Sequence, residues 1–138
     1  MRARSCIAAA LMAVAAAAAQ ACGFCIEDRV AAVYDSATIE AAVAKRRHVA
    51  FLAVDGETAL DPAAQKALVK ALEAAGALRG ATRVAGENAA VAVVFDPKRT
   101  TLAQLVAAGD RALATRHRKV TALRIIDEGG KLREPAAG

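Results

Sequence analysis

The sequence contains few aromatic residues, cysteines and histidines. Of its 138 residues only 3% are aromatic and none is tryptophan, so any core must be built from valine, leucine, isoleucine and alanine. Proteins that bind single-stranded nucleic acid stack bases on aromatic side chains, and this scarcity argues against a nucleic-acid partner. Three cysteines and two histidines also leave few candidate metal ligands.

Patterns that mark the common enzyme classes are missing as well. The sequence has no nucleophile–base signature, no glycine-rich phosphate loop and no histidine-rich metal-enzyme motif. We therefore expect a protein that is not an enzyme.

The first residues have the form of a secretory signal. Arg2 and Arg4 precede an apolar stretch from residue 6 to residue 19, which is too short to cross a hydrocarbon core of about 30 Å as a helix. Ala-Gln-Ala at 19–21 supplies the small residues of a cleavage site. We predict a signal peptide over 1–21 and export to the periplasm or beyond, with no membrane span after cleavage. An N-terminal anchor and a lipoprotein with its lipid on Cys22 are the alternatives.

Removal of the signal takes Cys6 with it and leaves Cys22 and Cys25, in the pattern Cys-Gly-Phe-Cys, at the start of the mature chain. Two thiolates at this spacing suit a soft metal, Cu(I) or Zn(II). Zinc requires four ligands and no third or fourth is evident, whereas two-coordinate Cu(I) requires only the thiolates. Two other interpretations stay open: thiol–disulfide exchange, and a small structural disulfide or a pair of inert thiols.

The net charge of +5 includes two basic clusters, at 45–48 (Lys-Arg-Arg-His) and 116–119 (Arg-His-Arg-Lys). Such clusters indicate either an anionic partner or cations in the last turn of a helix, where the macrodipole favours them. We favour the second interpretation, because both clusters end helical patterns.

Periodicity and turn signals predict the secondary structure of the mature chain. The predicted elements are a helical segment over 26–47 broken at 35–36, a strand over 48–54, a helix over 62–75, strands over 81–85 and 89–95, a helix over 101–116 and a strand over 120–126. Val30, Val33 and Tyr34 form a short apolar stripe in the first of these segments, and we expect Tyr34 in the core. Asp61-Pro62 and the capping-box residues Thr101 and Gln104 mark the starts of the two later helices.

This order is β-α-β-β-α-β after an N-terminal helical extension, and it predicts the α+β class with a ferredoxin-like sandwich. We expect four parts: a signal at 1–21, the cysteine segment with its helical extension at 22–47, the ferredoxin-like domain at 48–127 and a flexible tail at 128–138. Apolar residues on both faces of the 48–54 strand indicate that both are buried. The helical extension is available to cover the second face.

Residues 49–116 resemble the heavy-metal-associated domain, the small ferredoxin-like module of copper chaperones and metal-pumping ATPases. The resemblance is carried by Val-Ala-Val-Val-Phe-Asp-Pro at 91–97, by Thr100, Thr101, Leu102 and Leu105, and by the segments 76–78 and 81–84. It implies the fold. That family binds metal through Cys-x-x-Cys in the loop after its first strand, but the corresponding loop here, 56–61, contains no cysteine. No metal ligand is therefore implied by the resemblance.

The functional prediction is an exported protein that binds or transfers a copper-like soft metal through Cys22 and Cys25. Its expected partners are the metal ion and an exported protein. The alternative is a non-catalytic periplasmic interaction module with a structural disulfide, and a redox role is the less favoured third.

Overall fold

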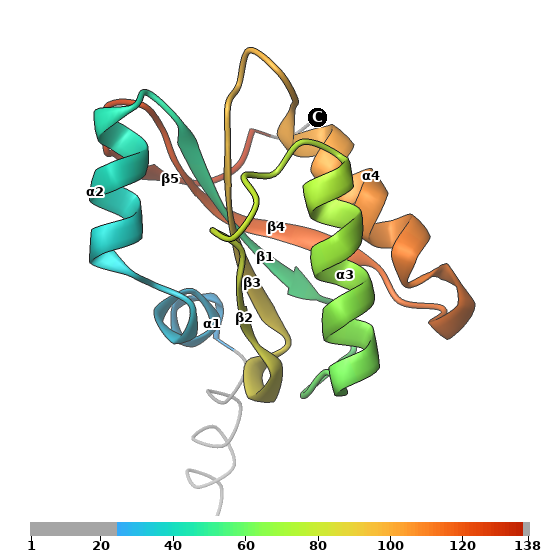
Figure 1. The fold of residues 1–138 in the computed structure, drawn as a ribbon. Helices are drawn as coiled ribbons and strands as arrows, with labels where there is room; N and C mark the ends of the chain where they lie inside the picture. Colours follow the sequence, from blue (N-terminus) through green and yellow to red (C-terminus); the bar gives the residue numbers. More distant parts are fainter. Residues whose placement is uncertain (1–24, 137–138) are drawn as a thin grey trace, which may run out of the picture.

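The computed structural model describes residues 25–136 (Figure 1). Its elements follow in the order α1 (Ile26–Ala32), α2 (Ser36–Ala44), β1 (His48–Val54), α3 (Pro62–Ala74), β2 (Arg83–Ala85), η2 (Gly86–Asn88), β3 (Ala90–Phe95), α4 (Leu102–Ala112), η3 (Ala114–Arg116), β4 (Val120–Ile126) and β5 (Leu132–Arg133).

The strands form one sheet in the order β2-β3-β1-β4-β5, and every paired neighbour is antiparallel. His48 lies opposite Phe95 at one end of the β1–β3 pair, and Val54 lies opposite Val120 in the β1–β4 pair. Without β5, this is the strand order of the split βαβ motif, with α3 and α4 as its two crossover helices. The predicted ferredoxin-like α+β fold is confirmed.

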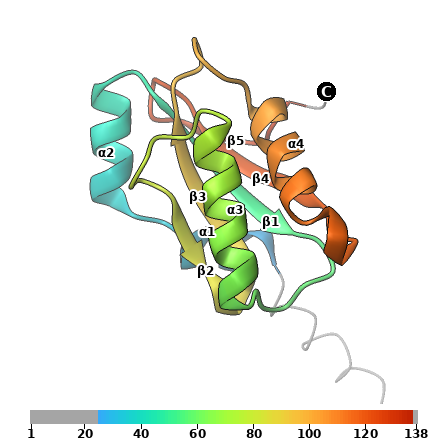
Figure 2. The ribbon, with the colours of Figure 1, turned by 45° about the vertical axis from the view of Figure 1, so that its right-hand side comes forward.

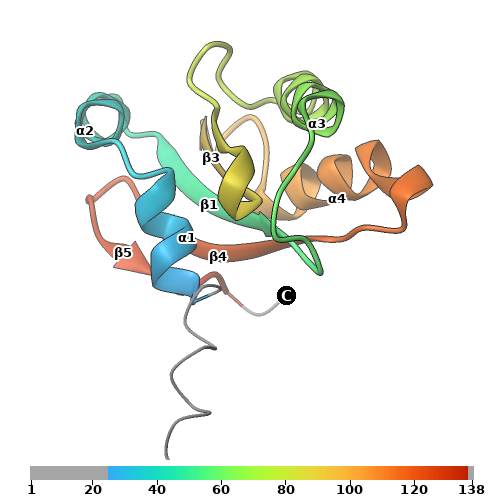
Figure 3. The ribbon, with the colours of Figure 1, turned by 90° about the horizontal axis from the view of Figure 1, so that it is seen from below.

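Helices cover both faces of the sheet. Helices α3 and α4 pack on one face, and α1 and α2 lie on the other (Figure 3). In Figure 2, α3 is in front of the sheet and α1 is behind it. Alternate residues of β1 enter separate cores: Leu52 packs with α3 and α4, and Phe51 packs with α1 and α2. The unbroken apolar run in β1 is thus explained, and the N-terminal extension covers the second face as expected.

Local sequence signals fix the two crossover helices. Asp61 caps α3 by accepting a hydrogen bond from the Ala64 amide at 2.9 Å, and proline follows it at the first helical position. Helix α4 opens with the expected capping box between Thr101 and Gln104. Further along α4, Gly109 allows close packing, since a Cβ there would lie 2.8 Å from a methyl group of Val120.

Three details differ from the sequence expectations. Leu132 pairs with Ile126 and starts β5, so the segment expected to be a flexible tail adds a strand to the sheet. The last predicted helix ends at Ala112, and a 3-10 turn follows it. Tyr34, expected in the core, is 51% exposed because α1 has already ended; its ring stacks on the outer side of Phe51 at a centroid distance of 6.2 Å.

Candidate functional site

Of the two predicted metal-binding cysteines, one falls within the described structure. Cys25 is the residue that precedes α1, its side chain is exposed, and its carbonyl accepts hydrogen bonds from the amides of Asp28 and Arg29 at 3.1 and 3.2 Å. Cys22 lies outside the described residues. The backbone of Cys25 is therefore fixed by the first turn of α1, with its thiol at the surface.

Helix α1 is short, and contacts with the domain hold it in place. Val30 and Val33 are 5% and 2% exposed in the second core. Arg29 Nη2 donates to the Glu57 carbonyl at 3.0 Å, and Glu27 pairs with Arg124 of β4 at 2.8 Å. Burial of a valine contributes roughly 1.5–3 kcal/mol, whereas a solvent-exposed ion pair contributes about 1 kcal/mol or less. The two buried valines therefore stabilise the docking of α1 more than the Glu27–Arg124 ion pair does. The segment that carries Cys25 is thus attached to the sheet rather than hinged beside it.

The loop between β1 and α3 is held by three arginines, from α1, from η3 and from the segment between η3 and β4. Arg29 of α1 binds the Glu57 carbonyl, Arg118 contacts the Glu57 carboxylate at 2.6 Å, and Arg116 of η3 pairs with Asp61. Arg118 and Arg116 thus pair with two carboxylates of the loop, Asp55 accepts a hydrogen bond from the Thr121 hydroxyl, and the loop contains no thiol or imidazole. The loop is therefore held in place by ion pairs and hydrogen bonds, and it contains no ligand that a soft metal prefers.

The two histidines do not complete a metal site in the described part of the chain. His48 is half-buried at the start of β1, with its ring edge-on to Phe95 at a centroid distance of 5.6 Å. His117 ends η3 in the left-handed conformation, with φ of 54°. Within residues 25–136, no three side chains of histidine, cysteine, aspartate or glutamate are arranged to hold a metal ion.

Three aspartates are held in their charged form by local hydrogen bonds. The Ala64 amide lowers the pKa of Asp61, and Arg116 lowers it further. The Thr38 amide, together with Arg83, likewise lowers the pKa of Asp35 at the start of α2. The Lys131 amide, together with Arg133, lowers the pKa of Asp127 in the β4–β5 turn. Each of these carboxylates fastens a helix start or a turn, and none has the raised pKa of a general acid.

The first basic cluster does not lie in the last turn of a helix, contrary to the sequence expectation, whereas Arg116 of the second cluster lies in the last turn of η3. Helix α2 ends at Ala44 with no cation in its last turn, and Lys45 is its C-cap. In the second cluster, Arg116 and Arg118 are neutralised by Asp61 and Glu57. None of the ion pairs within residues 25–136 includes a residue of the first cluster. The two clusters therefore differ in role: the second fastens a loop, whereas the first presents its charge to solvent.

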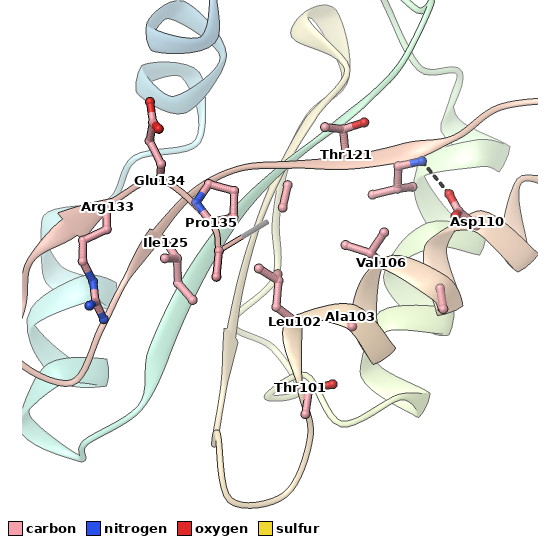
Figure 4. Close-up of a pocket in the computed structure, with 14 residues that line it drawn as sticks. Thr101, Leu102, Ala103, Val106, Asp110, Thr121, Ile125, Arg133, Glu134 and Pro135 are labelled. Carbon is pink, nitrogen blue, oxygen red and sulfur yellow. Dashed lines mark hydrogen bonds between the residues drawn. The ribbon is translucent and has the colours of Figure 1, made fainter. Parts of the chain in front are cut away.

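A groove with a volume of about 860 Å³ lies between α4, β4 and the segment after β5 (Figure 4). Its walls are mainly apolar and include Leu102, Val106 and Ile125. Asp110, at one end, accepts a hydrogen bond from the Val120 amide at 2.6 Å and so serves to start β4. No cysteine or histidine is among the residues that line this groove.

A second, smaller groove of about 180 Å³ lies beside the first basic cluster and was not foreseen from the sequence. It runs between α2 and the segment after α3, with Lys45 and Arg47 on one rim and Leu78 on the other. The sequence signal that pointed here was the 45–48 cluster itself. The sequence did not indicate that Leu78 lies beside this cluster, because residues 45–48 and 78 are brought together only by the pairing of β1 with β3.

The described architecture defines a ferredoxin-like domain with both faces of its sheet covered by helices. The chain matches no protein-family model and no curated protein. Among solved structures it is similar to oxidized MerP from Ralstonia metallidurans, with 21% identity, coverage of 55% of this chain and 96% of that chain, and a TM-score of 0.43. The fold assignment rests on the strand order and register given above. Within residues 25–136, no helix is long and apolar enough to cross a membrane.

Proposed function

We propose that this chain is an exported protein that binds a soft metal ion, Cu(I) in the first place, through the thiolates of Cys22 and Cys25. The observation that carries the proposal is the place of Cys25: an exposed thiol at the fixed start of a helix that is docked on the sheet. A second cysteine three residues earlier can approach the same ion, since Cys-x-x-Cys spacing brings two sulfurs together.

The surroundings of Cys25 favour copper over zinc. Zinc is held by four ligands, and the carboxylate nearest in sequence, that of Glu27, already pairs with Arg124. Two thiolates alone satisfy Cu(I), which prefers soft sulfur ligands. An accessible two-coordinate ion is also one that a partner's thiols can remove, which suits transfer as well as storage.

The test is a Cu(I) titration of protein recovered from cells that produce the full chain, under anaerobic reducing conditions with a competing chelator. We expect one Cu(I) per chain, and none in the Cys22→Ser, Cys25→Ser double variant. Cys6→Ser is the matched control, because a cysteine removed with the signal cannot affect uptake. Equal uptake by the double variant and the unmodified protein would refute the proposal. Mass spectrometry of the same samples reports the cleavage site and any lipid on Cys22.

A non-catalytic interaction module is the second candidate, and the two apolar grooves favour it. In that case Cys22 and Cys25 form a structural disulfide, and the double serine variant keeps its binding partner. A thiol–disulfide redox role requires reductase activity on a model disulfide that disappears when either cysteine is replaced.

A further inference from the structure

The end of the molecule formed by the start of β1 and the finish of β3 carries a concentration of unpaired positive charge. Lys45, Arg46 and Arg47 follow α2 directly into β1. Figures 1 and 2 both show the end of α2 and the turn between β3 and α4 at the same, upper end of the fold. That turn contributes Lys98 and Arg99, both exposed.

A further cation reaches this end through the segment that follows α3. The Leu78 amide donates to the Val94 carbonyl at 2.7 Å, and Ala77 forms a bridge with Phe95, so this segment lies along the end of β3. Arg79 is the next residue and is exposed. None of these six cations (45–47, 79, 98 and 99) takes part in an ion pair within residues 25–136.

The carboxylates at the same end are largely engaged in turns. Asp96 accepts a hydrogen bond from the Lys98 amide at 2.9 Å. Asp127, opposite His48 by register, accepts from the amides of its own turn and pairs with Arg133. Glu73, in the last turn of α3, accepts a hydrogen bond from the Gly80 amide at 3.1 Å, and Glu128 is a further exposed acid. The local field is therefore positive, and it is directed at solvent.

Amid these cations lies the apolar groove of about 180 Å³ between α2 and Leu78. Its floor includes Ala42 and Val94, both almost fully buried, and Leu78 is 36% exposed at its rim. A pocket of this size accommodates one apolar side chain, with Lys45 and Arg47 beside it. Charge and shape together describe a site for a chain segment that carries acidic residues around one apolar anchor.

Arg46 has a backbone conformation that glycine adopts more easily, as do Ala89 and His117. It adopts a left-handed conformation, φ 53°, in a Schellman ending: its own amide donates to Val43 and that of Arg47 donates to Ala42. Helix α3 ends with the same pair of hydrogen bonds, but with Gly76 at the equivalent position. An arginine where glycine fits better is a local strain of the kind that accompanies function.

We propose that this surface, defined by Lys45, Arg46, Arg47, Leu78 and Arg79, docks an acidic segment of a protein partner whose single apolar side chain enters the groove. The apolar groove between the cations favours such a segment over a flat anionic membrane. The proposal is independent of the thiols, and the double serine variant keeps this binding.

The probe is a fluorescein-labelled nonapeptide with one central leucine flanked by glutamates, followed by anisotropy at physiological salt. Two matched peptides replace the leucine by serine or the glutamates by glutamine. We expect the leucine–glutamate peptide to bind more tightly than both. In a ¹⁵N-labelled sample its amide shifts should concentrate at residues 45–48 and 78–81. Shifts centred on the α4 groove, or equal binding of the three peptides, contradict the proposal.

Variants separate this surface from general charge. Arg46→Gly with Arg47→Ser should weaken binding of the peptide roughly fivefold or more, since it removes two ion-pair partners. Lys66→Gln with Lys70→Gln, the same loss of charge on the outer face of α3, should leave binding within twofold. Leu78→Ser tests the groove alone and should remove the preference for leucine.

Equal weakening by the two double variants overturns the proposal, because it would indicate non-specific attraction. Binding to vesicles of phosphatidylcholine and phosphatidylglycerol is measured in parallel with binding to the peptide. Binding to vesicles without binding to the peptide would assign the surface to a membrane and overturn the proposal as stated. Thermal unfolding of each variant verifies that it is folded.

Discussion

At the scale of single residues, the conformation of Arg46 has a measurable effect on stability. A non-glycine residue in the left-handed region costs about 1 kcal/mol relative to glycine. We predict that Arg46→Gly raises the free energy of unfolding by about that amount and the melting temperature by about 4 °C for a domain of this size. Chemical denaturation and calorimetry measure both. If replacing Arg46 both stabilises the fold and weakens peptide binding, recognition rather than stability accounts for the arginine at this position.

Lys45→Gly is the control for this change. Lys45 has φ of −101°, where glycine has no steric advantage, so its replacement should lower stability through the added freedom of the unfolded chain. A gain in stability for Lys45→Gly, or a loss for Arg46→Gly, would mean that the backbone conformation of Arg46 does not carry the strain assigned to it.

At the scale of elements, the start of α4 depends on a reciprocal pair of hydrogen bonds. The Gln104 amide donates to Thr101 Oγ1 at 3.2 Å, and the Thr101 amide donates to Gln104 Oε1 at 3.0 Å. Thr101→Ala removes the first and should cost about 1 kcal/mol of stability, measured by urea unfolding. Thr101→Ser keeps the hydroxyl and should stay close to the unmodified protein. A similar loss in both variants would assign the effect to the methyl group and its packing.

Elements with strong local signals were predictable from the sequence. The apolar run of β1, the Asp61-Pro62 start of α3 and the capping box of α4 each depend on neighbouring residues, and each lies where it was expected. Strand β5 was missed because two exposed residues give no periodic pattern and form a strand only by pairing with Ile125 and Ile126. Tyr34 was misplaced because a helical stripe does not reveal that α1 stops at Ala32.

The candidate sites show the same limit of sequence reasoning. The Cys-x-x-Cys pair is visible in the sequence alone, and its role stays a prediction, with Cys22 outside the described residues. The docking groove could not be predicted, because Lys45 and Leu78 come together only through pairing along β1 and β3. The basic cluster at its rim was recognised in the sequence, but it was assigned to the last turn of a helix, and α2 ends at Ala44, before the cluster begins.

At the scale of the whole molecule, the free energy of unfolding should decrease as the pH is lowered into the acid range. The pKa values of Asp35, Asp61 and Asp127 are lowered in the folded state from the ordinary value of 3.8. The unfolded chain therefore takes up these protons at higher pH, so the stabilisation is present above about pH 4 and is lost as the pH falls through the folded values. The melting temperature should be level near neutrality and decline below about pH 4.

Replacement of the three aspartates by asparagine should lower stability at neutral pH and flatten the decline in acid. Asp28→Asn, at an exposed position in α1, is the control and should follow the unmodified protein across the titration. An unchanged acid profile in the triple variant would show that other groups govern unfolding in acid.

The core beneath α1 and α2 joins the two ends of the chain. Val30 and Val33 pack there with Leu123 and Ile126, which belong to the last long strand. Contacts between residues so distant in sequence form late, because the intervening loop must close first. During synthesis, the first two helices have no complete surface to dock on until β4 has left the ribosome, so we expect them to stay open to proteases until the last long strand has paired.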